Sequence, residues 1–79
     1  MDLETGKKFV RERNYIEAEK IFINLLHKGE NLILVNYFLG IIYFELQKYK
    51  QSKFHYENSL KLRKTLAPSL LEKINLAPS

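Results

Sequence analysis

The sequence predicts an all-α protein that forms one domain over residues 1–79. A chain of this length holds one small hydrophobic core, and a hydrophobic content of 46% is ordinary for a folded protein. Three glycines and two prolines leave few turns, which disfavours a fold built of many short strands. Apolar residues recur at helical spacing, and no stretch alternates with a period of two over more than a few residues. We therefore expect helices and no sheet.

The first part of the chain predicts two helices joined by a tight turn. Apolar residues at helical spacing indicate a helix over residues 3–12 and a second over 15–28, with the turn at 13–14. Gly29 follows the second helix, and glycine favours the left-handed conformation in which many helices end. We expect these two helices to form a helical hairpin.

The third predicted helix covers residues 32–46 and is the most apolar part of the chain. Asn31 stands at the position of an N-cap, which favours a helix start at this point. The stretch is shorter than the roughly 20 apolar residues that a membrane span needs. We therefore expect a buried helix and not a membrane-spanning one.

A second tight turn at residues 47–48 leads to the fourth predicted helix, which covers about 49–65 and is basic on its exposed face. Pro68 is expected to end this helix, because a proline inside a helix removes one backbone donor. Proline also suits the first turn of a helix. A short C-terminal helix is therefore expected over about 68–76.

The two halves of the chain repeat with an offset of 34 residues, which predicts one unit over about 1–31 and another over about 32–66. The aligned pairs keep their size or role: Gly6 and Gly40, Phe9 and Tyr43, Tyr15 and Tyr49, Ala18 and Ser52, Phe22 and Tyr56, Leu26 and Leu60. Small residues let the two helices of a hairpin approach closely, and rings then fill the space between hairpins. We expect eight repeat-packing residues: Gly6, Phe9, Ala18, Phe22, Gly40, Tyr43, Ser52 and Tyr56.

The repeat resembles the tetratricopeptide repeat family. The family pattern places Leu-Gly and then Tyr in a first helix, and Ala and then Phe in a second. These places are held by Thr5, Gly6, Phe9, Ala18 and Phe22 in the first unit and by Leu39, Gly40, Tyr43, Ser52 and Tyr56 in the second. The early tryptophan of the family is replaced by Asp2 and Asn36, and its closing proline by Glu30 and Lys64. The resemblance implies antiparallel helix pairs stacked as a solenoid with a concave binding face. We therefore expect a tetratricopeptide-like solenoid of about four helices, followed by the short C-terminal helix as a cap.

The composition gives no support to catalysis. Absence of cysteine excludes disulfides, thiolate zinc sites, iron–sulfur clusters and a cysteine nucleophile. His27 and His55 lack the i, i+4 spacing of a metal pair on one helix, and we expect both at the surface or its boundary. No glycine-rich phosphate loop, nucleophile elbow or paired-carboxylate motif is present. We expect no enzymatic activity, no catalytic or metal site, no cofactor and no small-molecule substrate.

The third helix carries two apolar stripes, whereas a surface helix needs only one. One stripe can pack inside the stack. The second is expected to line the concave surface with residues of the first helix, and the whole groove then consists of Leu3, Lys7, Val10, Arg11, Leu34, Tyr37, Phe38, Ile41 and Phe44. A suitable ligand is an amphipathic helix or peptide with bulky apolar anchors and an acidic flank. Either a partner protein or a second copy fills this groove, or the final helix folds back over it through Leu70, Leu71 and Ile74.

Two other functions stay open. A basic tract in the fourth helix, opposed only by Glu57, offers a surface for nucleic acid or anionic membrane lipid; it contains Lys48, Lys50, Lys53, Lys61, Arg63 and Lys64. The chain is alternatively a structural subunit of a larger assembly, including a homo-oligomer. The family's clamp for a terminal carboxylate is not expected, because Leu3 and Phe38 occupy two of its polar places. No signal peptide is evident near the N-terminus, so we expect a cytoplasmic protein.

Overall fold

The structure is a computed structural model that describes residues 2–75, with side chains described for residues 2–64. Its four helices are α1 (Leu3–Arg11), α2 (Tyr15–Lys28), α3 (Leu32–Glu45) and α4 (Tyr49–Asn75). Between residues 2 and 75 there is no strand. The prediction of an all-helical chain is therefore confirmed for this range.

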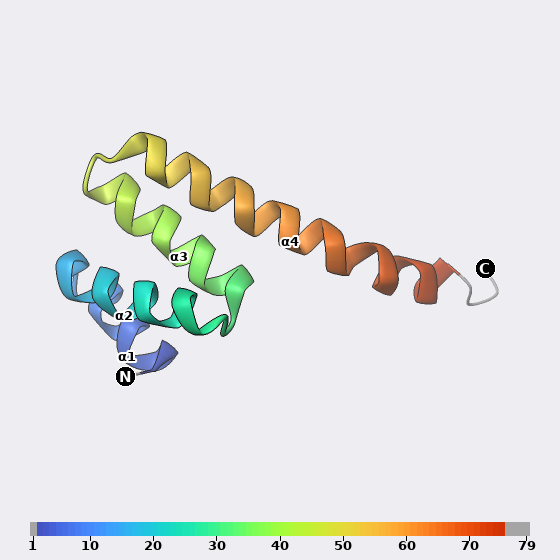
Figure 1. The fold of residues 1–79 in the computed structure, drawn as a ribbon, viewed down its shortest axis with the longest axis horizontal. Coiled ribbons are helices and arrows are strands. Elements are labelled where there is room, and N and C mark those ends of the chain that lie inside the picture. Colours follow the sequence, from blue (N-terminus) through green and yellow to red (C-terminus); the bar gives the residue numbers. More distant parts are fainter. Residues whose placement is uncertain (1, 76–79) are drawn as a thin grey trace.

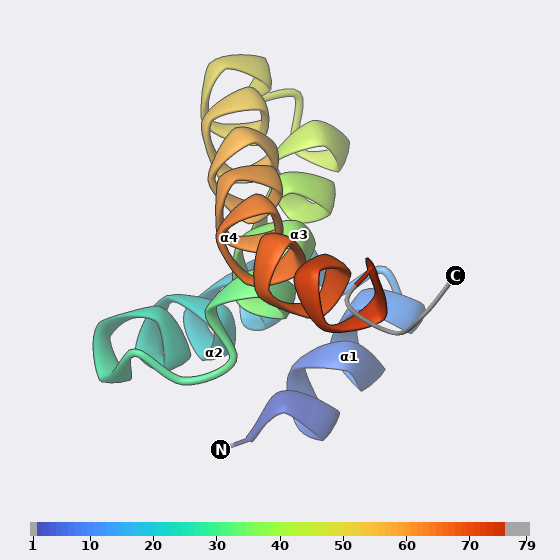
Figure 2. The ribbon, with the colours of Figure 1, turned by 90° about the vertical axis from the view of Figure 1, so that its right-hand side faces the viewer.

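The helices form two hairpins, α1 with α2 and α3 with α4, and α3 joins them by packing against α2. Figures 1 and 2 both show α3 and α4 side by side, with α1 and α2 together on one side of that pair. The core lies where α2 and α3 meet and consists of Ala18, Ile21, Phe22, Leu25, Val35, Leu39, Ile42 and Tyr43. The apolar stripe of α3 that contains Val35, Leu39, Ile42 and Tyr43 is thus part of this core.

Both hairpins close with the same backbone turn. Arg13 and Gln47 lie 34 residues apart, and both have a left-handed backbone, with φ of 60° and 63°. The next residue in each turn donates its backbone N–H to a carbonyl five positions back, in the bonds from Asn14 to Phe9 (2.8 Å) and from Lys48 to Tyr43 (2.7 Å). The 34-residue offset of the sequence is therefore also present in backbone geometry.

Each hairpin has a glycine in close contact with a ring of its other helix. A Cβ atom added at Gly6 would lie 2.9 Å from the ring of Phe22, and one added at Gly40 would lie 2.8 Å from the ring of Tyr56. The hydroxyl of Ser52 donates a hydrogen bond of 2.7 Å to the Gly40 carbonyl, which holds α3 and α4 at this separation. Glycine is required at both positions because the facing ring occupies the space of a side chain.

The end of α2 and the course of α4 differ for a reason visible in the repeat. Gly29 ends α2 in the left-handed conformation (φ 72°), as predicted. The residue 34 positions later is Arg63. Arginine adopts a left-handed backbone less readily than glycine, so α4 continues past this position. The predicted stop at Pro68 and the separate helix over 68–76 are wrong, since α4 runs unbroken to Asn75; residue 76 lies outside the described residues. A proline fits helical φ and removes only one hydrogen bond, so it can bend a helix without ending it.

The second half of α4 extends away from the other three helices (Figure 1). The hypothesis that a final helix folds back over the groove is therefore wrong, because the segment from 68 to 75 belongs to α4. The groove is not covered by this part of the chain.

The starts of α1 and α3 use different devices. The side chain of Asp2 caps α1 by accepting hydrogen bonds of 2.9 Å from the backbone N–H and the hydroxyl of Thr5, and these bonds lower the pKa of Asp2. The predicted N-cap at Asn31 is wrong in its mechanism. Asn31 has a left-handed backbone (φ 49°) and its side chain makes no capping bond. A side chain in that backbone conformation is not aimed at the helix's free N–H groups.

Candidate partner-binding surface

The predicted groove residues of α3 do not share one environment. Leu34, Tyr37 and Phe44 are exposed, and Ile41 is half-buried. Phe38 instead packs against the core, where its ring stacks on that of Phe22 with centroids 5.1 Å apart. Phe38 therefore supports the contact between the hairpins, and the other four side chains are the ones that α3 offers to a ligand.

The α1 side of the groove is more polar than the α3 side. Leu3 and Val10 are half-buried and pack against the core. Lys7 forms an ion pair of 3.4 Å with Glu4, and Arg11 is exposed. The two walls of the predicted groove therefore differ, with apolar side chains on α3 and cations on α1.

Exposed rings continue from α3 onto α4. The ring of Tyr37 lies 5.9 Å from that of Tyr56, and the ring of Phe44 lies 5.5 Å from that of Tyr49. Leu60, one turn beyond Tyr56 on α4, is also exposed. These five residues form what we call the open face: Tyr37, Phe44, Tyr49, Tyr56 and Leu60. A shallow hollow on it is lined by Phe44, Tyr49, Ser52, Lys53, Tyr56 and Glu57.

Sequence reasoning assigned Tyr49 and Leu60 no role in binding. Both were aligned with residues of the first unit, Tyr15 and Leu26, and that alignment was the available signal. Tyr15 and Leu26 are partly buried, whereas Tyr49 and Leu60 are exposed. The same residue type therefore stands at matching positions of the two units but is partly buried in the first and exposed in the second.

The tyrosines around the core keep their protons. Burial, followed by a hydrogen bond to Glu19, raises the pKa of Tyr43 to about 12. Burial also raises the pKa of Tyr56, helped by the nearby Tyr37 and Glu45. Both hydroxyls are therefore neutral hydrogen-bond donors near pH 7, and neither is an activated nucleophile.

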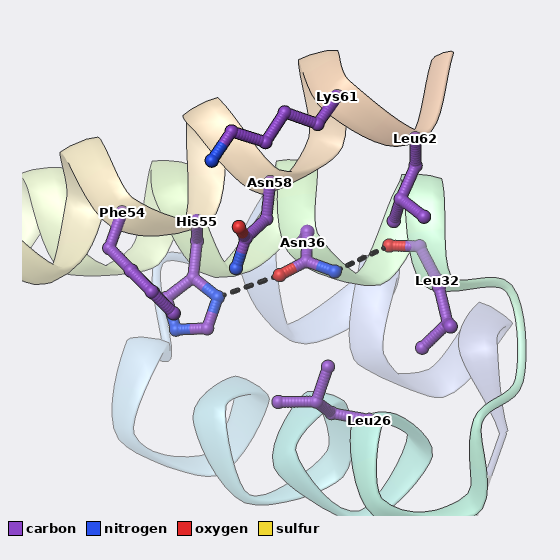
Figure 3. Close-up of a pocket in the computed structure, with 8 residues that line it drawn as sticks. All are labelled: Leu26, Leu32, Asn36, Phe54, His55, Asn58, Lys61 and Leu62. Atoms are coloured by element: carbon purple, nitrogen blue, oxygen red, sulfur yellow. Dashed lines mark hydrogen bonds between the residues drawn. The ribbon is translucent and has the colours of Figure 1, made fainter. Parts of the chain in front are cut away.

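His55 is buried, with 8% of its surface exposed, so the prediction that it lies at the surface or its boundary is wrong. Its Nδ1 lies 2.8 Å from Oδ1 of Asn36, whose Nδ2 donates a bond of 2.9 Å to the carbonyl of Leu32 (Figure 3). Because the amide nitrogen is the donor to Leu32, Oδ1 accepts and Nδ1 of His55 carries the proton. Burial lowers the pKa of His55, which keeps the imidazole neutral.

Asn36 and His55 form a buried pair between α3 and α4. The ring of His55 stacks on Tyr43 with centroids 5.4 Å apart and so fills space between α3 and α4. The Asn36 side chain connects that ring to the backbone at the start of α3. Ring and amide together occupy the interhelical space as a hydrogen-bonded pair.

A second hollow lies between α2 and α4, with α3 beneath it (Figure 3). Its lining is mostly apolar and consists of Leu26, Leu32, Asn36, Phe54, His55, Asn58, Lys61 and Leu62. The histidine and Asn36 are already bonded to each other. Across the described residues, no group of three or more His, Asp or Glu side chains is placed to hold a metal ion.

The basic tract lies mainly on exposed parts of α4. Lys50, Lys53, Arg63 and Lys64 are exposed, and Lys53 is 3.9 Å from Glu57. The ammonium of Lys48 lies 5.9 Å from the centre of the Tyr43 ring. In the part of the chain that the structure describes, no helix is both long and apolar enough to cross a bilayer.

Comparisons of the sequence and the structure with known proteins identify no related protein. No family model matches the chain, and neither a curated protein nor a solved structure matches it. The assignment to a family therefore remains a proposal, and it is supported by the 34-residue repeat.

Proposed function

We propose that the chain is a non-enzymatic protein interaction module of the tetratricopeptide type, which binds an amphipathic helix or peptide of another protein. The single observation that carries this proposal is the continuous exposed apolar surface of α3 and α4. Tyr37, Phe44 and Tyr49 are 45%, 55% and 58% exposed. Ring contacts pair Tyr37 with Tyr56 and Phe44 with Tyr49, and the shallow hollow lined by Phe44, Tyr49 and Tyr56 joins the two pairs. Contiguous exposed apolar surface on a small soluble protein is typical of an interaction site.

The repeated geometry supports the tetratricopeptide-like arrangement. The left-handed turn residues, the turn hydrogen bonds and the glycine–ring contacts all recur with the 34-residue offset. Stacked hairpins of one period are what the solenoid hypothesis requires. The groove between the α1 and α3 walls would be its concave side.

The buried polar side chains of α3 and α4 have a structural role, because they hydrogen-bond the two helices to each other. Ser52 and Ser59 donate to carbonyls of α3, at Gly40 and Ile33, over 2.7 and 2.9 Å. Asn36 and His55 bond to each other. These side chains hold α4 against α3, which leaves the exposed apolar surface as the feature that the packing of the chain does not use.

The test is affinity capture from the native source, with mass spectrometry of the retained proteins. The purified chain is compared with the double variant Leu34→Ala/Phe44→Ala and with the control Phe54→Ala. Phe54 is 59% exposed and lies on α4 outside the open face. We expect a protein that is retained by the wild type and by the control and lost with the double variant, because buried aromatic anchors dominate most interfaces.

Equal retention by all three proteins would contradict the proposal. Loss of the bound material with increasing salt, together with recovery of nucleic acid, would favour the basic tract of α4 instead. Binding through phosphate contacts falls steeply with salt, whereas burial of apolar surface does not.

A further inference from the structure

The internal repeat indicates what the open face is shaped to hold. In the first hairpin, four side chains are partly buried because they pack against the core that α2 and α3 form: Leu3, Val10, Tyr15 and Leu26. The residues 34 positions later are exposed by 45%, 55%, 58% and 52%: Tyr37, Phe44, Tyr49 and Leu60. The same face of the two hairpins is therefore covered in the first and uncovered in the second.

The covering element of the first hairpin is α3. Phe22 of α2 is fully buried and its ring stacks on Phe38 of α3. Tyr56, the counterpart of Phe22, is only half-buried, and its described ring neighbour, Tyr37, comes from its own hairpin. The second hairpin therefore has the surface that receives a helix such as α3, without that helix.

We propose that a helix of a partner protein docks on the open face in the position that α3 takes on the first hairpin, and that this helix is flanked by acidic residues. The inference rests on the proposed function and narrows it, because it names the face, the binding mode and the charge of the partner. The bound helix adds one layer to the stack.

The apolar pattern of the partner follows from α3. The core side chains of α3 and its C-cap include Val35, Phe38, Leu39, Ile42 and Leu46, which stand at relative positions 0, 3, 4, 7 and 11. A helix with large apolar residues at this spacing presents one stripe to the open face. Its remaining positions face solvent or the rim of the open face.

A second copy of this chain cannot supply such a helix in the same orientation. The residues of α1 at the positions of Phe38, Leu39, Ile42 and Leu46 are Glu4, Thr5, Lys8 and Glu12. Glu4, Lys8 and Glu12 are exposed and charged, so the outer face of α1 has no apolar stripe. The stack is therefore polar at its α1 end and apolar at its α4 end, and copies do not continue head to tail.

Charge argues for an acidic partner over symmetric pairing of two copies. Between residues 48 and 64 the chain has six Lys and Arg residues and one glutamate, Glu57. Lys53 and Glu57 line the hollow of the open face itself, and Arg63 and Lys64 are exposed further along α4. Two open faces brought together would place like charges side by side, whereas acidic residues beside the partner's stripe would meet these cations.

The experiment uses the full 79-residue chain and two synthetic helical peptides. Both peptides keep the five α3 stripe residues at their spacing; one has Glu and Ala at the other positions, and the second has Lys in place of Glu. Binding is measured by fluorescence anisotropy. We expect the Glu peptide to bind at least about tenfold more tightly than the Lys peptide at low salt. Tyr49→Ala and Leu60→Ala should each weaken its binding by about tenfold or more.

Matched controls separate this face from the concave groove. Phe54→Ala removes an equally exposed ring from α4, and Leu34→Ala removes an exposed side chain of the groove. Phe54→Ala should leave the affinity for the Glu peptide unchanged within about threefold, whereas Leu34→Ala should weaken it less than Tyr49→Ala does. Circular dichroism should show wild-type helicity for all four variants.

Several results would overturn the inference. Absence of binding of the Glu peptide, or equal binding of the Lys peptide, would reject the acidic helix. Loss of binding with Leu34→Ala but not with Tyr49→Ala would move the site to the groove, and the proposed function would survive. A dimer in sedimentation equilibrium that Tyr49→Ala dissociates would make a second copy the occupant. Failure of the proposed function is seen separately, in the capture experiment.

Discussion

Replacement of Gly40 by alanine tests the close contact between α3 and the Tyr56 ring of α4. The added Cβ would lie 2.8 to 2.9 Å from three atoms of the Tyr56 ring, including Cγ at its root, so the ring cannot escape by a small rotation. Overpacking of this kind typically costs about 1–3 kcal/mol. Removal of a glycine from a helix interior returns about 1 kcal/mol. We expect a net loss of up to about 2 kcal/mol in the free energy of unfolding, or a melting temperature lower by up to about 15 °C.

A double-mutant cycle with Tyr56→Ala shows whether the ring is the cause. Without the ring, the Cβ at position 40 has room, and only the gain in helix propensity remains. Gly40→Ala should therefore destabilise the wild type but stabilise the Tyr56→Ala variant by up to about 1 kcal/mol. Urea unfolding followed by circular dichroism at 222 nm measures all four proteins.

The sign reversal is the decisive result. If Gly40→Ala changes the stability of the wild type and of Tyr56→Ala by the same amount, the ring does not oppose the Cβ. In that case the glycine–ring contact does not set the distance between α3 and α4. The repeat register that aligns Gly40 with Gly6 would then lose its main physical basis.

Three further perturbations follow from the fold. Burial lowers the pKa of His55 below its ordinary value of 6.5, so in mild acid the unfolded chain binds a proton that the folded chain does not. The melting temperature should therefore fall between about pH 7.5 and pH 5.5, and His55→Gln should reduce that fall. Arg13→Gly and Gln47→Gly should each raise the stability by about 0.5–1 kcal/mol, because glycine adopts their left-handed backbone without strain; a lower melting temperature for either would count against the turn geometry. Duplication of residues 29–62, by joining Leu62 to a second copy of the chain from Gly29 onward, adds one 34-residue unit. The longer chain should melt at a higher temperature than the wild type because an α3 helix then covers the open face, and an unchanged melting temperature would contradict that packing.

Local patterns predicted most of the fold. Apolar spacing and turn residues placed the start of all four helices at Leu3, Tyr15, Leu32 and Tyr49. The end of α2 was predictable because Gly29 adopts a left-handed backbone at low cost. The end of α4 was not, because Pro68 lies inside the helix and Arg63 stands where a terminating glycine would be needed.

The site was less predictable because it depends on contacts between helices. Periodicity shows that α3 has two apolar stripes, but not that Phe38 stacks on Phe22 while its neighbour Tyr37 remains exposed. The bond between Asn36 and His55 joins residues 19 positions apart on different helices. The residue pattern of one helix cannot predict a contact with another helix. The sequence alone therefore predicts a surface position for His55.

The projecting second half of α4 affects how this protein behaves in solution. The 27 residues of α4 span about 40 Å, roughly twice the length of α3, and the molecule measures 48 × 26 × 22 Å. Its radius of gyration is 14.8 Å, against about 12 Å for a compact chain of this length. An elongated monomer meets more friction than a sphere of equal mass and leaves a gel-filtration column early, at the volume of a larger globular protein. Light scattering, which reports mass and not shape, will therefore distinguish this monomer from a true dimer.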